Sequence, residues 1–328
     1  MKNIGSFYYK NEQGGIICEL CPHNCHLRDG QIGICGVRQI IDGELFTLNY
    51  GEVSSAALDP IEKKPLYHYK PGKKILSVGS FGCNFSCGFC QNYSIAKEYP
   101  NTQYIPPEEL IKIAVKAKED GNIGIAFTYN EPSIWYEYIR DVISANHEDL
   151  DLVLVSNGYI SKEPLLELLP HIKAMNIDLK AFNKGFYNSV CKGDMDNVLN
   201  TIKLASSKCH VEVTTLVIPG YNDAAEELED LAKWLAAVDK DIPLHLSAYH
   251  PAYNFHVPPT SLEELLAAYN TAIKHLSYVY IGNVLGAETK TYCPKCHEPL
   301  IKRNGFNTEV LIYKNKCPFC EEHINIIL

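Results

Sequence analysis

The sequence lacks the features that would place the chain in a membrane, on a nucleic acid or in a secretory pathway. No apolar run approaches the roughly 18–20 residues that span a bilayer. Basic residues are in the minority and the net charge is -9, which argues against a dedicated nucleic-acid-binding protein because phosphate contacts need clustered Lys and Arg. The first residues, 1–5, lack the apolar stretch of a secretory signal, so we expect a cytoplasmic protein.

The composition is that of an ordinary globular protein. The chain has 46% hydrophobic and 21% charged residues. This composition excludes a protein that is mainly disordered, collagen-like or coiled coil. The 328 residues suffice for one large α/β domain with small attachments, or for two ordinary domains. What the sequence has in excess is cysteine, with 13 residues. In a reducing cytoplasm so many thiols indicate metal binding rather than disulfide bonds.

The cysteines fall into three groups, and only Cys191 and Cys209 lie outside them. A disulfide framework would be spread through the fold, so the grouping predicts three metal sites. Cys209 is expected to be a small buried hydrophobe, whereas Cys191 has either a relay role or a packing role. The groups are Cys18, Cys21, Cys25 and Cys35; Cys83, Cys87 and Cys90; and Cys293, Cys296, Cys317 and Cys320.

The last group consists of two C-x-x-C pairs, one beginning at Cys293 and the other at Cys317. This arrangement is typical of a zinc ribbon, in which four thiolates surround one tetrahedral ion. Strand-like runs on either side of Asn304-Gly305, a turn signal, fit the same interpretation. With the first pair, His297 also completes a c-type haem pattern, but the second pair and the missing export signal argue against haem.

The first group offers four thiolates near the start of the chain. Four thiolates bind either Zn²⁺ or an iron–sulfur cluster, and the sequence leaves the choice of metal open. His23 and His26 lie among the cysteines and could replace one of them, although a solvated loop histidine is the more common outcome.

The middle group has three cysteines in a C-x3-C-x2-C spacing, with the aromatic residue Phe89 just before Cys90. Structural zinc sites and ordinary [4Fe–4S] clusters both use four protein ligands. A set of three would leave one iron of a [4Fe–4S] cluster open to a ligand that the protein does not supply. The alternative interpretation is an incomplete ferredoxin or zinc site.

Strand-like and helix-like segments alternate downstream of an expected strand over 74–80. We expect further strands over 122–128, 152–156, 174–178, 211–218, 243–248 and 279–281. Asp223 with Glu226, and Thr260 with Glu263, form capping signals for two of the intervening helices. Repeated strand–helix units imply a parallel sheet, so we predict an α/β fold with a partial (β/α)6-type barrel.

The barrel is expected over residues 73–285. Residues 1–72 would form an N-terminal four-cysteine extension, and residues 286–328 a zinc-ribbon-like module. Because parallel barrels place their chemistry at the C-terminal ends of the strands, the polar residues that follow the expected strands are candidates for the site. Taken singly, each is also explained by turn chemistry. They are Asn130, Glu131, Ser156, Asn157, Asp178, Lys180 and His250.

The three-cysteine spacing, directly after an apolar strand, resembles the signature of radical S-adenosylmethionine (SAM) enzymes. The resemblance implies that Cys83, Cys87 and Cys90 hold a [4Fe–4S] cluster whose open iron binds SAM. It further implies that the reduced cluster cleaves SAM to methionine and a 5′-deoxyadenosyl radical, which abstracts a hydrogen atom from a substrate.

The resemblance also implies SAM contacts at the strand ends. Asn130 and Glu131 look like part of a variant Gly-Gly-Glu motif beside the SAM amino group, and Ser156 and Asn157 look like the polar pair that reaches the ribose or carboxylate. The further implied contacts are Phe89, Asp178, Lys180 and His250. The Asp-x-Lys at 178–180 is similar to that of glycyl-radical-enzyme activases, with a structural ion pair as the alternative.

Over nearly its whole length the sequence resembles the AmmeMemoRadiSam system radical SAM enzyme, a family similar to pyruvate formate-lyase activating enzyme. The resemblance rests on the cysteine groups, on residues 33–38 and above all on residues 59–68. It implies MEMO-type and AMMECR1-domain proteins as partners, and the chemistry implies a one-electron reductant of the flavodoxin or ferredoxin type. It implies no substrate.

Three classes of function therefore compete. The first is a radical SAM enzyme, with an activating enzyme that installs a glycyl radical on a partner protein as the alternative within this class. The second is a ferredoxin-like electron carrier whose clusters each have four protein ligands. The third is a zinc-ribbon interaction protein without iron.

Overall fold

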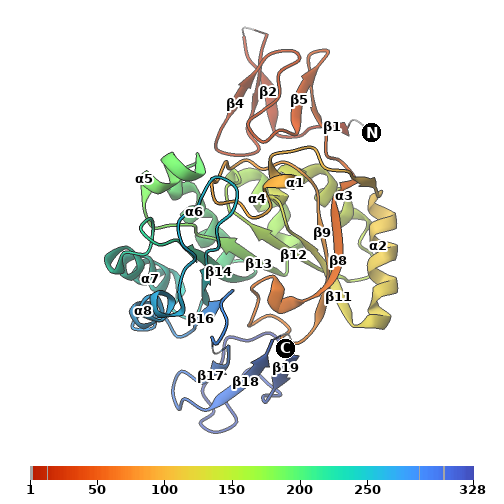
Figure 1. Ribbon diagram of the computed structural model, residues 1–328. Helices are drawn as coiled ribbons and strands as arrows, with labels where there is room; N and C mark the ends of the chain where they lie inside the picture. Colours follow the sequence, from red (N-terminus) through yellow and green to blue (C-terminus); the bar gives the residue numbers. More distant parts are fainter. Residues whose placement is uncertain (1–2, 13, 288, 306) are drawn as a thin grey trace.

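The computed structural model describes residues 3–12, 14–287, 289–305 and 307–328. A central α/β unit carries small N-terminal sheets at one end and a small C-terminal sheet at the other (Figure 1). Met1 and Lys2, which belong to the stretch expected to lack a secretory signal, lie outside the described residues. Within the described ranges, no helix combines the length and the apolar character needed to cross a membrane.

The central sheet has eight strands in the order β16-β15-β14-β13-β12-β11-β9-β8. All neighbouring pairs from β9 to β16 are parallel. The strands are largely buried, which is why they read as apolar runs in the sequence. Their bounds are β8 (Ser55–Pro60), β9 (Lys74–Gly79), β11 (Asn122–Phe127), β12 (Asp151–Ser156), β13 (Ala174–Asp178), β14 (His210–Val217), β15 (Leu244–Ala248) and β16 (Val279–Gly282).

Helices follow the strands in the order that the sequence predicts. The long ones are α2 (Pro107–Lys116), α3 (Tyr136–Ala145), α4 (Lys162–Leu168), α6 (Met195–Ser206), α7 (Ala225–Asp239) and α8 (Leu262–Ala272). Two short ones, α1 (Tyr93–Ala96) and α5 (Lys184–Phe186), lie in loops, and a π-helical turn (Tyr187–Cys191) follows α5. The mostly parallel sheet agrees with the expected fold class. Six strand–helix units precede β16, and the sheet is open, with β8 and β16 at its edges.

Two local expectations were wrong. Asp223 does not cap α7, because its carboxylate accepts the backbone N–H of Gly220 at 3.0 Å within the preceding turn. The hydroxyl of Thr260 donates to the carbonyl of Val217 at 2.6 Å. The capping box of α8 is therefore formed one residue later, by Ser261 and Glu264.

The segment before the barrel contributes a strand that the sequence pattern did not reveal. Residues 55–60 were expected in the N-terminal extension, but they form β8, which pairs antiparallel with β9 from Ser55↔Gly79 to Pro60↔Lys74. The strand is half exposed and contains Asp59 and Pro60, so it lacks the apolar run of its neighbours. The domain boundary at residue 72 stays a prediction.

The N-terminal extension is built from short antiparallel strands. One sheet contains β2 (Tyr8–Lys10), β3 (Ile16–Cys18) and β4 (Cys25–Leu27), and another contains β1 (Asn3–Ile4), β6 (Glu44–Thr47) and β5 (Arg38–Ile41). A third pair joins β7 (Glu52–Val53) to β10 (Gln103–Tyr104). The extension is fastened to α3 by an ion pair between the buried Arg38 and Glu137, with an N–O distance of 2.5 Å.

The C-terminal residues form an antiparallel sheet of β17 (Thr291–Tyr292), β18 (Pro299–Asn304) and β19 (Asn307–Val310). The turn between β18 and β19 lies where Asn304-Gly305 predicts it. A small core packs Tyr278 and Tyr280 against Leu300 and Ile301. The module therefore shares apolar contacts with the end of the central sheet rather than hanging from a linker.

A buried carboxylate on β14 fastens the segment before β9, residues 64–70, which we call the strap. Glu212 accepts the backbone N–H groups of Tyr67 at 3.0 Å and His68 at 2.7 Å. It also contacts His245 at 2.6 Å and His210 at 3.0 Å. Burial opposes ionisation, but the two histidines outweigh it and hold the pKa of Glu212 well below its ordinary value.

The strap also contacts the C-terminal module. The ring of His68 bonds the carbonyl of Asn325 and the hydroxyl of Tyr280, at 2.7 and 2.6 Å. Arg303 donates to the carbonyl of Tyr67 at 2.6 Å. The strap thus joins three parts of the chain through one buried hydrogen-bonded network.

Replacing Glu212 by Gln should destabilise the fold strongly. The amide keeps the shape but loses the charge and turns an NH₂ group toward donors, which costs about 3 kcal/mol when a buried charged pair is broken. The measurement is the melting temperature of the metal-loaded protein at neutral pH, with Glu226→Gln on the exposed start of α7 as the control. Equal melting temperatures for the two variants would contradict this account of the strap.

Candidate functional site

The three-cysteine loop follows β9 and is fixed by a side chain from the end of β11. Asn130 accepts the backbone N–H of Ser80 at 2.9 Å and donates to the carbonyl of Gly82 at 3.0 Å. Asn92, just beyond the loop, donates to the carbonyl of Tyr129 at 2.7 Å. The backbone on both sides of the cysteines is therefore held to the end of the neighbouring strand.

Gly82 permits the close approach of the loop to the N-terminal extension. It adopts a φ of 84°, and a Cβ at this position would lie 2.6 Å from the carbonyl oxygen of Cys35. The N–H of Cys83 donates to that same oxygen at 3.2 Å. Any residue larger than glycine would push the extension away from the loop.

The sulfur atom of Cys83 has two donors directed at it. The backbone N–H of Phe85 lies 3.4 Å from Cys83 Sγ, and Asn157 Nδ2 lies 3.8 Å from it. Burial raises the pKa of Cys83 to about 12 and also raises that of Cys90. Lys97 donates to the carbonyl of Phe85 and, at 3.2 Å, to the hydroxyl of Ser86. Three thiols on one loop, with two N–H groups directed at the sulfur of Cys83, form a donor set that fits an iron–sulfur cluster.

The carboxylate oxygens of Glu131 accept hydrogen bonds that join the ends of β11 and β12. It accepts the N–H of Ser133 at 2.9 Å, the hydroxyl of Ser156 at 2.8 Å and the N–H of Asn157 at 2.7 Å. Burial raises its pKa, against these hydrogen bonds. The expected contact of Glu131 with SAM stays a prediction, and the structure gives this carboxylate a clear positioning role.

Asn157 and Asn84 form a second link between the strand ends and the loop. The Asn157 amide donates to Asn84 Oδ1 at 2.9 Å, and Asn84 donates to the carbonyl of Tyr159 at 2.7 Å. Asn84 is not among the site residues predicted above, because an asparagine in a loop carries no signal of its own. Lys97 was missed altogether, since nothing in its local sequence indicates a contact with the cysteine loop.

Asp178 and Lys180, at the end of β13, form an ion pair with an N–O distance of 3.0 Å. Burial alone would lower the pKa of Lys180, but the carboxylate of Asp178 and the nearby thiols of Cys87 and Cys191 raise it well above its ordinary value. The ammonium lies 5.8 Å from the centre of the Phe89 ring. The structure therefore brings this charge pair to the cysteine loop, as the strand-end rule predicts.

The loop after β15 packs over the cysteine loop through aromatic contacts. Phe89 is buried and lies 5.7 Å, ring centre to ring centre, from Phe255. The N–H of Asn254 donates to the carbonyl of Gly88 at 2.9 Å. His250, in the same loop, is exposed and contacts the carbonyl of Asn283 at 3.0 Å. Its implied SAM contact stays a prediction, and its described partner belongs to the segment after β16.

Cys191 lies against the middle group although it is far from it in sequence. It ends the π-helical turn, is fully buried, and its carbonyl accepts the N–H of Ser86 at 2.9 Å. The neighbouring thiol of Cys191, together with burial, raises the pKa of Cys87 well above its ordinary value. The residue is therefore packed in the core and in contact with a ligand group at the same time.

The four N-terminal cysteines line one small cavity between the extension and the barrel. Cys18 and Cys25 face each other across the β3–β4 pair, and Cys21 lies between these strands. Cys35 follows in the loop that reaches Cys83. His23 lines the same cavity, but its Nε2 is engaged with the carbonyl of Asn84 at 2.7 Å, and His26 is exposed on β4.

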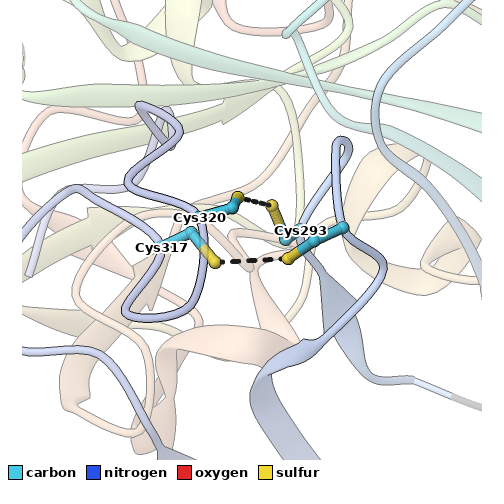
Figure 2. A group of neighbouring side chains, drawn as sticks. Cys293, Cys317 and Cys320 are labelled. Carbon is cyan, nitrogen blue, oxygen red and sulfur yellow. Dashed lines mark hydrogen bonds between the residues drawn. The ribbon is translucent and has the colours of Figure 1, made fainter.

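The four C-terminal cysteines converge more closely (Figure 2). Their sulfur atoms all lie within 4.8 Å of one another, with 3.5 Å between Cys293 and Cys320 and 3.5 Å between Cys296 and Cys317. Four sulfurs this close form a site for a single ion. A four-cysteine group with the convergence of a single-ion site is thus present, as the two C-x-x-C pairs predict.

Comparison with known proteins agrees with this arrangement. Residues 77–235 match the family model of the radical SAM superfamily. An uncharacterized protein of Methanocaldococcus jannaschii is 41% identical over 334 residues, covering 98% of each chain. A second protein of that organism, provisionally named a glycyl-radical enzyme activating enzyme, is 29% identical over 214 residues, covering 62% of this chain and 79% of its own.

The fold is also shared with a solved structure. The radical SAM methyltransferase of Sphaerobacter thermophilus superposes with a TM-score of 0.52 at 18% identity, covering 66% of this chain and 68% of the methyltransferase. At this identity the likeness concerns the fold alone. With a full-length relative, a superfamily match over residues 77–235 and three cysteines that follow the parallel strand β9, the chain belongs to the radical SAM superfamily of enzymes.

Proposed function

We propose that this protein reductively cleaves SAM and uses the resulting 5′-deoxyadenosyl radical to abstract a hydrogen atom from a substrate. The observation that carries the proposal is the loop with Cys83, Cys87 and Cys90, which lies among the polar ends of the neighbouring parallel strands. Membership of the superfamily implies a [4Fe–4S] cluster, SAM and a one-electron reductant. A flavodoxin or ferredoxin is the reductant that we expect. The bound cluster and SAM would supply the electron and the cleavable sulfonium bond.

The chain's own residues would position and shield these groups. Asn130 fixes the backbone of the cysteine loop, and Asn157 donates toward Cys83. The ion pair of Asp178 and Lys180 offers both charges that the amino acid part of SAM requires. Phe89 and Phe255 would exclude water from the cluster side of the site.

Replacing Cys87 by Ala should abolish 5′-deoxyadenosine formation by the reconstituted, dithionite-reduced protein. Only two thiolates would remain in the loop, so one iron of the cluster would lose its protein ligand. The cluster would then not be held firmly enough to bind SAM. The measurement is chromatographic detection of 5′-deoxyadenosine, with Cys209→Ala, outside all three groups, as the control. Product formation by the Cys87 variant at the control's rate would sink the proposal.

A second candidate, installation of a glycyl radical on a partner protein, is favoured by the name of one relative. The Asp-x-Lys at 178–180 supports it, because the resemblance assigns the same pattern to activating enzymes. Mixing the reduced protein and SAM with a candidate glycyl-radical enzyme should then produce the partner's radical signal in electron paramagnetic resonance (EPR) spectra. If 5′-deoxyadenosine forms without a radical on any candidate partner, the small-molecule alternative is favoured.

We further infer that the protein belongs to the AmmeMemoRadiSam group and acts with MEMO-type and AMMECR1-domain proteins. The support is the sequence block at residues 59–68, which includes most of the strap. Its residues are engaged inside the fold, so the block marks the family without forming the partner surface. Mixing the purified proteins and testing whether they elute together from a size-exclusion column tests the partnership. Elution as separate species would contradict it.

The C-terminal cluster is proposed to bind zinc, because two C-x-x-C pairs converge on a single-ion site. Cys317→Ser should lower the zinc content by about one ion per chain while the iron content stays unchanged. Elemental analysis after anaerobic purification makes the measurement, again with a Cys209 variant as the control. Loss of iron instead of zinc would show that the four C-terminal cysteines bind an iron–sulfur cluster.

A further inference from the structure

We propose that Cys18, Cys21, Cys25 and Cys35 bind an auxiliary [4Fe–4S] cluster that passes electrons to the cluster at Cys83, Cys87 and Cys90. The proposal rests on the proposed function for the second cluster. Its own support is independent and comes from the spacing of the sulfurs, the lining of the cavity and the contact between the two ligand loops.

The spacing of the sulfur atoms separates the three cysteine groups into two kinds. Around one tetrahedral zinc with bonds of about 2.3 Å, sulfurs stand about 3.8 Å apart. Among the residues that the structure describes, the C-terminal group is the one that converges on a single-ion arrangement, with its four sulfurs all within 4.8 Å of one another. Among the described residues, neither the middle group, for which the superfamily implies a cluster, nor the N-terminal group gathers its sulfurs into such a single-ion arrangement. A cluster places each thiolate on a different iron, so its ligands stand farther apart than those of a single ion.

The cavity between the N-terminal cysteines has a polar donor without a partner. Arg38 lines it, and its guanidinium is buried, with Nη1 on the carbonyl of Ser6 at 2.9 Å and Nη2 on Glu137 at 2.5 Å. Its Nε is buried and has no hydrogen-bond partner within the described chain. Burying an N–H without a partner is costly, and the sulfide and thiolate sulfurs of a bound cluster would accept it.

The wall of the cavity also leaves room beside the sulfurs. Gly33 lines it, and a Cβ at this position would lie 3.7 Å from Cys25 Sγ and 3.8 Å from Cys35 Sγ. Gly33 is not in the left-handed region, so its backbone conformation does not require glycine. The missing side chain keeps the space next to two ligands open.

The N-terminal site touches the SAM-cluster loop directly. The carbonyl of Cys35, a ligand residue of one site, accepts the N–H of Cys83, a ligand residue of the other, at 3.2 Å. His23 Nε2 contacts the carbonyl of Asn84 at 2.7 Å, which makes a second bridge. Because electron tunnelling falls steeply with distance, two clusters joined by one hydrogen bond between their ligand residues are well placed for transfer.

The electron balance is simple. A low-potential one-electron donor reduces the N-terminal cluster by one electron, and that cluster returns to its oxidised state when the electron moves to the cluster at Cys83. Cleavage of one SAM molecule consumes the electron. A second carrier of this kind would let the external donor dock on the extension rather than at the substrate side of the barrel.

The metal content of the anaerobically purified, reconstituted protein gives the first test. We expect about eight irons and about one zinc per chain, whereas about four irons and two zincs would overturn the proposal. In the double variant Cys21→Ser/Cys25→Ser the iron should fall by half with the zinc unchanged. Cys209→Ser is the matched control. If the double variant does not fold, the iron and zinc content of the wild-type protein alone decides whether the auxiliary cluster is present.

EPR spectra distinguish failure of this inference from failure of the proposed function. In reduced wild-type protein, SAM should change one cluster signal and leave a second unchanged, and the double variant should lose the unchanged signal. In Cys87→Ala the SAM-insensitive signal should remain. A SAM-sensitive signal alone would overturn the auxiliary cluster while supporting the proposed function. Two SAM-insensitive signals would overturn the proposed function and leave the auxiliary cluster in place.

The relay is tested by the choice of donor. With a flavodoxin as donor, the double variant should form 5′-deoxyadenosine at least tenfold more slowly than the Cys209→Ser control, whereas with dithionite, which reaches the SAM cluster directly, the two rates should be similar. Equal rates with both donors would show that the N-terminal site is outside the electron route and would overturn the relay.

Discussion

The buried carboxylate of Glu212 is the constraint on which the arrangement of the whole chain depends. It lies in the amino-terminal half of β14, ionised and almost without exposure, and it needs several donors to remain so. Two backbone N–H groups of the strap and two histidines provide them. Through Tyr67 and His68 this network reaches the C-terminal module, and through the strap's continuation into β9 it sets the start of the strand that presents the cysteine loop.

Much of the site could be predicted because spacing and order determine it. Three cysteines after an apolar strand, and polar residues after the following strands, must meet at one edge of a parallel sheet. Asp178 and Lys180 meet the loop for this reason alone. What the sequence did not reveal depends on single long-range contacts: Asn130 holding the loop, Cys191 reaching Cys87, and β8 joining the sheet with a half-exposed, proline-ended strand. The cap expected at Asp223 failed because a nearer donor in the preceding turn engages its carboxylate.

The two ends of the central sheet serve different purposes. At the carboxyl end, Glu131 accepts the backbone N–H of Asn157, and the side-chain amide of Asn157 contacts Cys83 Sγ and donates to Asn84, so short polar side chains position the cysteine loop. At the amino end, Glu212, His68 and Arg303 tie chain segments together. The N-terminal extension lies at the end of the central unit that carries the cysteine loop, and the C-terminal module lies at the opposite end (Figure 1).

The bond from His68 to Asn325 joins residues 257 positions apart, and this separation bears on how the chain is made. During synthesis the strap emerges early, yet its partners on β14 and in residues 325–327 appear much later. Contacts between distant residues are slow to form because the intervening chain must first be closed into a loop. The strands β2, β3 and β4, which carry Cys18 and Cys25, pair locally and can form early, so in a new chain they would precede the late contacts that fasten the strap.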